Sequence, residues 1–159
     1  MLWFSGCSHQ CERCHQPYTW NPQLGQDFTE KTIEEVISIT DNDYTAGITL
    51  TGGDPFYPEN NQAMFYFLRE FHEELPTKTV WAWTGFTYEY IIEQPEMKRI
   101  LDYVDVLVDG KFDYQQRQID LQQPNHKELL KYRGSTNQRV IDVNKSYENN
   151  SVILYDPRQ

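Results

Sequence analysis

Three cysteines lie within one short stretch near the start of the 159-residue chain, at Cys7, Cys11 and Cys14. They are all the cysteines of the sequence. The C-x3-C-x2-C spacing can bring three thiolates around one metal site, and a short loop of this kind can wrap an iron–sulfur cluster while leaving one coordination position without a protein ligand. An iron atom with such an open position can bind a small molecule. The cysteines therefore predict a metal centre that has room for a ligand.

Structural zinc is the alternative for the same three thiols. His9 or His15 would then complete a Cys3His site, because zinc prefers four sulfur and nitrogen ligands. The spacing alone leaves both metals open. An odd number of clustered cysteines suits metal ligation in a reducing compartment better than it suits a disulfide framework. Apart from a zinc role, we interpret His9 and His15 as loop residues.

The composition limits the partners and the location of the protein. The sequence has 14 Lys and Arg residues against 24 Asp and Glu residues, a net charge of −10. This balance argues against binding nucleic acid or an anionic membrane through a broad basic face. No apolar run approaches the roughly 20 residues that span a bilayer, and the N-terminus has no signal-peptide pattern. We therefore expect a cytoplasmic protein with one domain over residues 1–159.

Strands and helices that could position the cysteines alternate along the chain. The apolar run Leu2–Phe4 predicts a buried strand that delivers Cys7 at its carboxyl end, and the segment 6–27 predicts a long loop for metal ligation. Further strands are predicted at 47–51, 79–84 and 104–108, and helices at 29–40, 64–75, 88–92 and from Pro95 onward. This alternation favours a parallel sheet whose strand ends meet at one rim, where α/β folds bind ligands. The residues expected on that rim are Cys7, Gly52, Thr84 and Asp109.

Residues 113–159 carry a weaker pattern. The part from 113 to 128 is polar and rich in glutamine, which favours irregular structure. A possible edge strand covers 138–143, and another short strand covers 152–155 after a turn at Asn149–Asn150. We therefore expect a short and less regular C-terminal part.

A second motif, Thr51-Gly52-Gly53-Asp54-Pro55, follows the second predicted strand. Together with the cysteine motif, it resembles the radical S-adenosylmethionine superfamily. Three further segments extend the resemblance to the anaerobic ribonucleotide reductase activating enzymes: Trp83–Phe86, Asp105–Phe112 and Arg133–Arg139. The matches run in order from about Leu2 to Asp142. The resemblance implies an α/β fold with mostly parallel strands, in the form of a partial (βα) barrel of the radical S-adenosylmethionine type.

The resemblance also implies cofactors and a reaction. A [4Fe-4S] cluster would be held by the three cysteines, and the amine and carboxylate of S-adenosylmethionine would chelate its free iron. Reductive cleavage of S-adenosylmethionine gives a 5′-deoxyadenosyl radical, which abstracts hydrogen from a glycine in the large subunit of anaerobic ribonucleotide reductase. Such an oxidoreductase needs no side-chain acid or base, and a flavodoxin-like protein would supply the electron.

Positions in the two motifs match those that contact the cofactors in this family. Gly52 and Gly53 lack side chains, so the backbone can approach a ligand closely. Backbone carbonyls or the Asp54 carboxylate can accept hydrogen bonds from the ammonium group of the ligand. The positions whose backbone lies along the cofactor in the family are Arg13, Cys14 and His15. Arg13 stands where many superfamily members have an aromatic residue.

Several polar residues near the later strands have two interpretations. Asp109 or Lys111 can face the cofactor or the partner, or they can form a turn with a solvated lysine. Thr84 ends a strand at the predicted rim and is a further candidate. A group of polar residues in the last matching segment can belong to the site or can cap a sheet edge. These are Ser135, Asn137, Gln138 and Arg139.

Two other functions stay open at this point. The first is an activase of another glycyl-radical enzyme, of the formate-lyase type, although the distal motifs and the short chain favour the reductase. The second is a non-catalytic interaction domain stabilised by zinc. Family members usually carry a Gly-Pro-Gly element before the first strand, whereas Met1 already stands at that strand here. Either the chain is naturally short or its start is incomplete.

Overall fold

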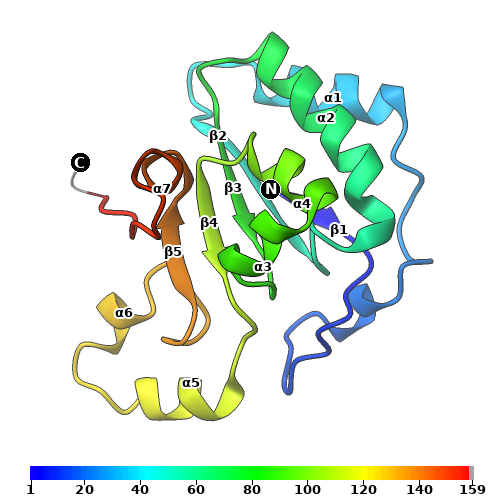
Figure 1. Cartoon of the computed structure of the whole chain (residues 1–159). Coiled ribbons are helices and arrows are strands. Elements are labelled where there is room, and N and C mark those ends of the chain that lie inside the picture. Colours follow the sequence, from blue (N-terminus) through cyan, green and yellow to red (C-terminus); the bar gives the residue numbers. More distant parts are fainter. Residues whose placement is uncertain (158–159) are drawn as a thin grey trace.

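One five-stranded sheet organises the α/β fold of the protein (Figure 1). The computed structural model describes residues 1–157. Neighbouring strands follow each other in chain order, as β1 (Leu2–Phe4), β2 (Gly47–Gly52), β3 (Thr79–Trp83), β4 (Val106–Asp109) and β5 (Arg139–Asp142). The first four strands are parallel, and β5 runs antiparallel to β4. The predicted α/β fold with a mostly parallel sheet is confirmed.

Helices cover one face of the sheet (Figure 1). Four of them connect the parallel strands: α1 (Glu30–Thr40), α2 (Asn61–Glu74), α3 (Tyr88–Glu93) and α4 (Pro95–Leu101). Right-handed crossovers between strands in sequential order put each connecting helix on the same side. The alternation of burial along β2 follows from this arrangement, because Ile48 and Leu50 are buried in the core while Thr49 and Thr51 on the other face are half-buried.

The core lies between this helical layer and the sheet. Phe67, Leu68 and Phe71 of α2 are fully buried with Leu50 of β2 and Leu107 of β4. Their helical spacing in the sequence predicts one apolar face for packing, and the structure confirms it. No helix among residues 1–157 is long and apolar enough to cross a membrane.

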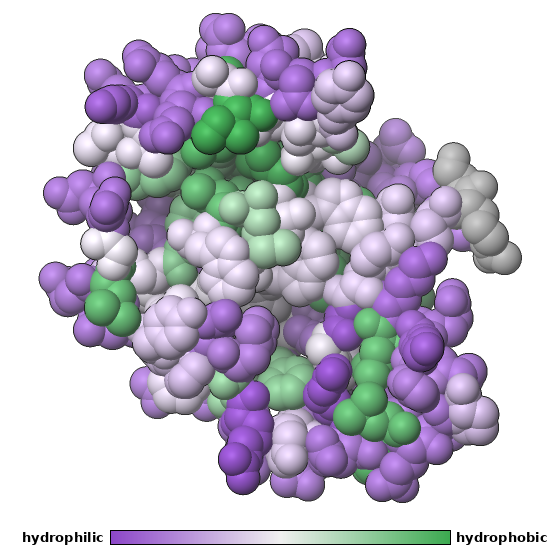
Figure 2. Space-filling view, turned by 180° about the vertical axis from the view of Figure 1, so that it is seen from behind, coloured by the Kyte–Doolittle hydropathy of each residue, from purple (hydrophilic) through white to green (hydrophobic). Residues whose placement is uncertain are grey.

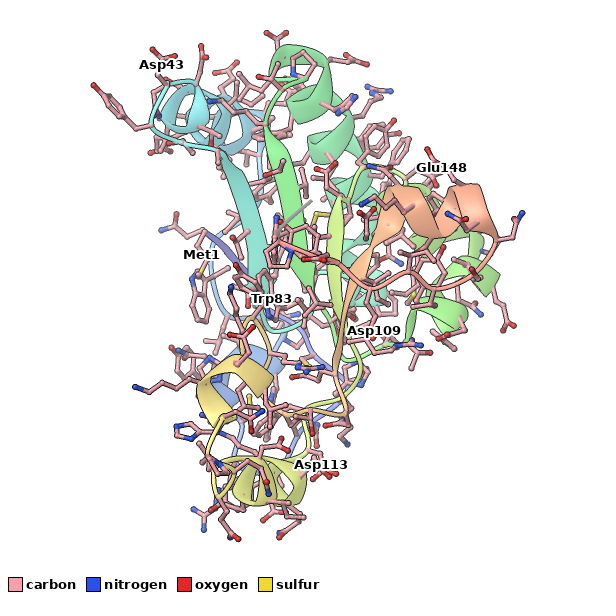
Figure 3. All side chains as sticks on the ribbon, turned by 90° about the vertical axis from the view of Figure 1, so that its left-hand side faces the viewer. Met1, Asp43, Trp83, Asp109, Asp113 and Glu148 are labelled. Atoms are coloured by element: carbon pink, nitrogen blue, oxygen red, sulfur yellow. The ribbon has the colours of Figure 1, made fainter. Side chains whose placement is uncertain are left out.

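The other face of the sheet carries half-buried side chains, among them Trp81 and Trp83 of β3. Figure 3 shows the five strands side by side, with Met1 beside β1, Trp83 at the end of β3 and Asp109 at the end of β4. Figure 2 shows the molecule from this side, where apolar and intermediate residues form a band between hydrophilic rims. The cleft described below lies on this side of the sheet, since Thr49, Thr51 and Trp83 line it.

The C-terminal part is more regular than predicted. It contains three short helices besides β5: α5 (Tyr114–Asp120), α6 (His126–Leu129) and α7 (Val143–Asn149). Their polar composition hides them from an analysis of periodicity, but side-chain caps define the starts of α5 and α7. The Asp113 carboxylate accepts a hydrogen bond from the Gln116 backbone N–H at 2.9 Å, and Asp142 does the same for Lys145 at 3.0 Å.

The two strands predicted in this part have different outcomes. The prediction at 138–143 is confirmed over Arg139–Asp142 only, because the chain enters α7 at Val143. The strand predicted at 152–155 is wrong, since the segment makes a single isolated bridge between Leu154 and Ile141. Such a bridge involves one residue of the segment, so alternating apolar residues alone do not make residues 152–155 a strand.

Candidate functional site

One cleft of about 740 Å³ brings most of the predicted site residues together. Those that line it are Cys7, Cys11, Arg13, Cys14, His15, Gly52, Gly53, Asp54 and Thr84. Residues from the C-terminal part close the opposite wall, including Phe112, Tyr114 and Gln138. The cleft therefore lies between the cysteine loop, the carboxyl ends of β2 and β3, and the segments that flank α5.

The cysteine loop folds back on itself at the carboxyl end of β1. The Gly6 N–H donates to the Thr19 carbonyl oxygen at 2.8 Å, where Thr19 belongs to a 3-10 helix over Pro17–Trp20. The Cys14 N–H donates to the Cys11 carbonyl oxygen at 3.1 Å and closes a tight turn. All three thiols are free and half-buried. The loop thus presents three reduced cysteines to one side.

Two residues of the loop have left-handed backbone conformations. Gln10 has φ 45° and Arg13 has φ 56°, and each immediately precedes a cysteine. Side chains other than glycine rarely adopt this region, at a cost of about 1 kcal/mol or more for each residue. The surrounding hydrogen bonds hold these conformations, and the curled backbone turns Cys11 and Cys14 toward the cleft.

Two of the thiols, those of Cys7 and Cys11, lie in surroundings that favour the protonated form. Burial raises the pKa of Cys7 above its ordinary value of 9.0, and the nearby Asp54 carboxylate adds to the effect. Burial also raises the pKa of Cys11, although the positive charge of Lys111 opposes it. A metal must therefore displace protons from these sulfur atoms.

Three free thiols without a neighbouring hard ligand fit a metal that prefers sulfur, which iron–sulfur clusters and zinc both do. Within residues 1–157, no three Cys, His, Asp or Glu side chains converge on a position for a single metal ion. The donor set and its position on the wall of a large cleft are compatible with a cluster bound between the loop and the strand ends.

Alkylation of the metal-free protein tests the protonation state of the thiols. Because the pKa of Cys7 and that of Cys11 are raised in the folded chain, less thiolate is present at a given pH than in the unfolded chain. We expect iodoacetamide to modify both residues more slowly in the folded protein at pH 7.5. In urea, the rate of alkylation stops rising once the pH exceeds the pKa of the unfolded thiols. At that pH the rate of alkylation of the folded protein should still be rising. Peptide mass spectrometry gives the rate for each cysteine, and equal rates in both states would contradict the raised pKa values.

The Gly-Gly-Asp turn packs directly against the segment that leads into the cysteine loop. Gly53 N–H donates to the Phe4 carbonyl at 2.7 Å, and Asp54 N–H donates to the Gly6 carbonyl at 2.8 Å. Gly52 has φ 107°, and a Cβ at Gly53 would lie 2.5 Å from the Gly6 carbonyl oxygen. The two glycines are therefore required by close backbone contact with β1 and the loop. Among residues 1–157, no hydrogen bond reaches the carbonyl oxygen of Gly53, which leaves it free for a ligand.

The Asp54 carboxylate points into the protein and is 1% exposed. It accepts hydrogen bonds from the Phe56 N–H at 2.9 Å, from the Thr84 hydroxyl at 2.9 and 3.0 Å, and from the Gly85 N–H at 2.9 Å. His9 Nε2 lies 3.0 Å from its Oδ2 atom. Since a carboxylate offers about four acceptor positions, these neighbours fill it. Asp54 fixes the end of β2 to the end of β3, and Thr84 lies in the site as one of its donors.

His9 is the site residue that the sequence analysis missed. It lines the cleft, and its ring meets the Phe86 ring edge-on at a centroid distance of 4.4 Å. A Cβ on Gly85 would lie 2.3 Å from the imidazole, so the ring fits against bare backbone. The only sequence signal for this role was the position of His9 between two cysteines.

Arg13 and His15 line the cleft with largely exposed side chains. The Arg13 guanidinium lies over the Tyr114 ring at 5.9 Å from its centroid. His15 meets Trp3 edge-on at 6.5 Å. Tyr114 therefore supplies an aromatic ring beside Arg13 at the wall of the cleft.

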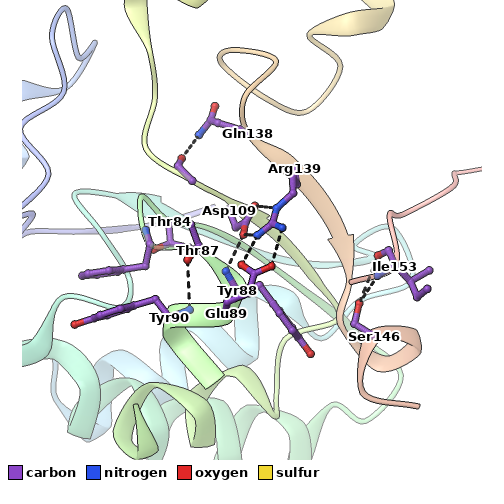
Figure 4. A network of polar contacts seen from close by, with 12 residues as sticks. Thr84, Thr87, Tyr88, Glu89, Tyr90, Asp109, Gln138, Arg139, Ser146 and Ile153 are labelled. Atoms are coloured by element: carbon purple, nitrogen blue, oxygen red, sulfur yellow. Dashed lines mark hydrogen bonds and ion pairs between the residues drawn. The ribbon is translucent and has the colours of Figure 1, made fainter. Parts of the chain in front are cut away.

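Asp109 and Lys111 do not line the cleft. Asp109 is 1% exposed, and its carboxylate accepts a hydrogen bond from the Tyr88 N–H at 2.7 Å. It also forms an ion pair with Arg139, whose Nε donates to Oδ1 at 2.9 Å (Figure 4). The Lys111 carbonyl oxygen accepts a hydrogen bond from Asn137 at 2.8 Å. These contacts give Asp109 a structural place on the side of the sheet that the helices cover.

The other polar residues of the last motif tie the C-terminal loops together. The Ser135 hydroxyl accepts from the Asp113 N–H at 3.1 Å. The Gln138 side chain accepts from the Gly134 N–H at 2.8 Å and donates to the Gly110 carbonyl at 2.8 Å, the latter drawn in Figure 4. Gln138 also lines the cleft. This wall of the cleft is thus held by side-chain hydrogen bonds rather than by a helix or a strand.

Replacing Arg139 tests this framework. Arg139 joins Asp109 to Glu89, to which it donates two hydrogen bonds of 2.8 and 2.7 Å. Arg139→Gln leaves the buried Asp109 charge without its cation. We expect the free energy of unfolding in urea to fall by about 2 kcal/mol, less than for a fully buried pair because the Arg139 side chain is 33% exposed. Arg69→Gln, which breaks an exposed pair with Glu73, is the control and should cost below about 0.5 kcal/mol. Equal losses would contradict the role of Arg139.

The same network predicts a dependence of stability on acidity. Hydrogen bonds from Arg139 hold the pKa of Glu89 below its ordinary value of 4.5. The stability that this carboxylate contributes is fully present above pH 4.5 and is lost as the pH falls through the lowered pKa. We expect the difference in unfolding free energy between the native sequence and Arg139→Gln to shrink as the pH is lowered below that value. A difference that is constant from pH 7 to pH 3 would contradict this assignment.

Comparison with known proteins bears on the chemistry of the cleft. Residues 1–141 match the family model described as a 4Fe-4S single cluster domain. The match covers the cysteine loop, the Gly-Gly-Asp turn and the first four strands, so the chain carries an iron–sulfur domain. No solved structure matched the chain.

Curated relatives share most of the chain. A protein from Enterobacteria phage T4 is 40% identical over 140 residues, which are 88% of this chain and 81% of the relative. Proteins from Pasteurella multocida and Escherichia coli K12 are 36% and 34% identical over 141 residues, which are 87% of this chain and 84% of each relative. All three are named anaerobic ribonucleoside-triphosphate reductase-activating protein.

Proposed function

The chain belongs to the family of anaerobic ribonucleoside-triphosphate reductase-activating proteins, and we propose that it is the enzyme that activates an anaerobic ribonucleotide reductase by generating a glycyl radical on its large subunit. The observation that carries the proposal is the meeting of two motifs in one cleft. Three free thiols lie on one wall, and the Gly-Gly-Asp turn lies beside them.

Cys7, Cys11 and Cys14 would hold the [4Fe-4S] cluster. When bound, the cluster supplies an electron that cleaves S-adenosylmethionine reductively, and the resulting radical takes a hydrogen atom from a glycine. Three protein ligands leave one iron position free for the amine and carboxylate of S-adenosylmethionine. Burial raises the pKa of the Cys7 and Cys11 thiols, and these residues must release their protons when iron binds.

The Gly53 carbonyl is the acceptor that we assign to the ammonium group of S-adenosylmethionine. It lies at the cleft wall and has no partner among the described residues. Asp54 would act behind it, because its carboxylate already accepts hydrogen bonds from Phe56, Thr84 and Gly85 and lies against His9. Its task is to keep the turn and the end of β3 in register while the ligand binds.

The shape of the sheet supports access for a peptide. Four parallel strands in sequential order with helices on one face are the arrangement expected of a partial (βα) barrel. The cleft lies at the carboxyl ends of these strands, where barrels bind their substrates. Its volume of about 740 Å³ accommodates a ligand, and the substrate glycine would enter from the open side as part of a loop. A flavodoxin-like protein would deliver the electron to the cluster.

Electron paramagnetic resonance of a reconstituted system tests this function. The protein is loaded with iron and sulfide without oxygen and then mixed with reductant, S-adenosylmethionine and the large subunit of an anaerobic ribonucleotide reductase. We expect a glycyl radical signal on that subunit and release of 5′-deoxyadenosine. A formate-lyase type partner serves as a parallel substrate, and a signal only on that partner would reassign the target. Zinc in place of iron and sulfide after anaerobic purification would overturn the radical chemistry.

A further inference from the structure

His9 lies at the junction of the three segments that build the cleft. It belongs to the cysteine loop, between Cys7 and Cys11. Its Nε2 atom lies 3.0 Å from Oδ2 of Asp54, at the end of β2, and its ring packs against Gly85 and Phe86, just beyond β3. The side chain is 15% exposed. One side chain thus connects the metal-ligating loop to both strand ends that face it.

The Nε2 atom of His9 lies beside the Asp54 carboxylate without forming a hydrogen bond to it. Asp54 accepts hydrogen bonds from Phe56, Thr84 and Gly85, so that of its about four acceptor positions the one left for His9 is the last. His9 Nε2 is buried and lies close to the carboxylate, but its N–H direction does not complete a hydrogen bond within residues 1–157. A hydrogen bond between these two atoms would be charge-assisted, because the acceptor is a carboxylate.

We propose that His9 is a positioning residue for the iron–sulfur cluster: it fastens the arm of the loop between Cys7 and Cys11 to the Asp54 turn, so that the thiols and the ligand-binding turn move as one unit. This inference rests on the proposed function. The packing of the ring supports it, because a Cβ at Gly85 would occupy the place of the imidazole. Phe86 holds the opposite edge of the ring, and it is itself stacked on Tyr90 at 5.2 Å.

Two amide substitutions of different length test the role of Nε2. His9→Gln places an N–H donor about as far from the backbone as Nε2, whereas His9→Asn carries its donor too close to the backbone to reach Asp54. His72→Asn is the matched control, because His72 is an exposed residue on α2 away from the cleft. Each protein is loaded with iron and sulfide anaerobically and then exposed to a chelator. The rate of cluster loss is followed by the iron–sulfur absorbance.

We expect His9→Asn to lose its cluster about tenfold faster than the native protein, the factor that one charge-assisted hydrogen bond provides. His9→Gln and the His72 control should lose it at nearly the native rate. The spectrum of the reduced cluster should change on addition of S-adenosylmethionine in the native protein and in His9→Gln, and change less in His9→Asn. The metal-free variants should unfold at nearly the same temperature, which separates positioning from a general loss of stability.

The outcomes distinguish this inference from the proposed function. A native protein that holds an iron–sulfur cluster and responds to S-adenosylmethionine, together with a His9→Asn variant that behaves identically, would overturn the role of His9 alone. The same holds if His9→Gln is as defective as His9→Asn, since the donor would then not matter. A native protein whose cluster does not respond to S-adenosylmethionine would overturn the proposed function and this inference with it.

Discussion

Replacing any one of Cys7, Cys11 and Cys14 by serine is expected to abolish glycyl radical formation. The three thiols lie on one wall of the cleft, and residues 1–157 contain no other cysteine that could substitute for a lost ligand. A hydroxyl group is a hard ligand that stays protonated at neutral pH, so it does not replace a thiolate on iron. We expect the radical yield to fall by at least about 1000-fold, because the chemistry depends on the cluster rather than on a side-chain acid or base.

The control for this experiment is Ser8→Ala, which changes an exposed side chain of the same loop. It should keep the native radical yield and iron content. The metal-free cysteine variants should unfold within about 0.5 kcal/mol of the metal-free native protein, since half-buried thiols contribute little to packing. A serine variant that retains four iron atoms and forms the radical would show that the cysteine in question is not a ligand.

Much of this site follows from the sequence because its parts have strong local signals. The three cysteines lie close enough in the sequence to ligate one metal site, and their loop follows a strand whose apolar run is visible in Leu2–Phe4. Parallel pairing then brings the ends of β1 and β2 together, as the register of Phe4 with Gly52 shows. The alternation of Ile48 and Leu50 with threonines identifies the covered face. These features depend on spacing, which a sequence displays directly.

The rest depends on side-chain directions, which spacing does not fix. The sequence leaves open whether backbone carbonyls or the Asp54 carboxylate contact the ligand, and in the structure the carboxylate oxygen atoms face Thr84 and Gly85 of the next strand end. The His9 side chain meets Asp54, a residue of another segment, so this contact exists only after β2 and the loop have met. The short helices α5 and α7 have too few apolar residues to show a periodic face, and only their N-terminal capping residues indicate them. Long-range polar contacts decide the first two cases, and local side-chain caps decide the helices.

Replacing Asp54 by asparagine is the second change with a large expected effect. The carboxylate accepts the Phe56 N–H on one oxygen and the Gly85 N–H on the other. Asparagine has a single acceptor oxygen, so either orientation of the amide turns an NH2 group toward a buried backbone N–H. One donor then loses its partner in the interior, and the charge that faces His9 is lost as well. We expect the free energy of unfolding of the metal-free protein to fall by about 3 kcal/mol.

Asp113→Asn is the control for this substitution, because Asp113 caps α5 through one hydrogen bond at an exposed position where asparagine serves equally well. It should change the unfolding free energy by less than about 0.5 kcal/mol. Measuring stability without metal or ligand separates a structural role of Asp54 from a role in ligand binding. If Asp54 only contacted S-adenosylmethionine, Asp54→Asn would weaken ligand binding and leave the metal-free protein at its native stability. A loss that is already present in the metal-free state, accompanied by reduced iron uptake, identifies Asp54 as the residue that joins β2 to β3 behind the ligand.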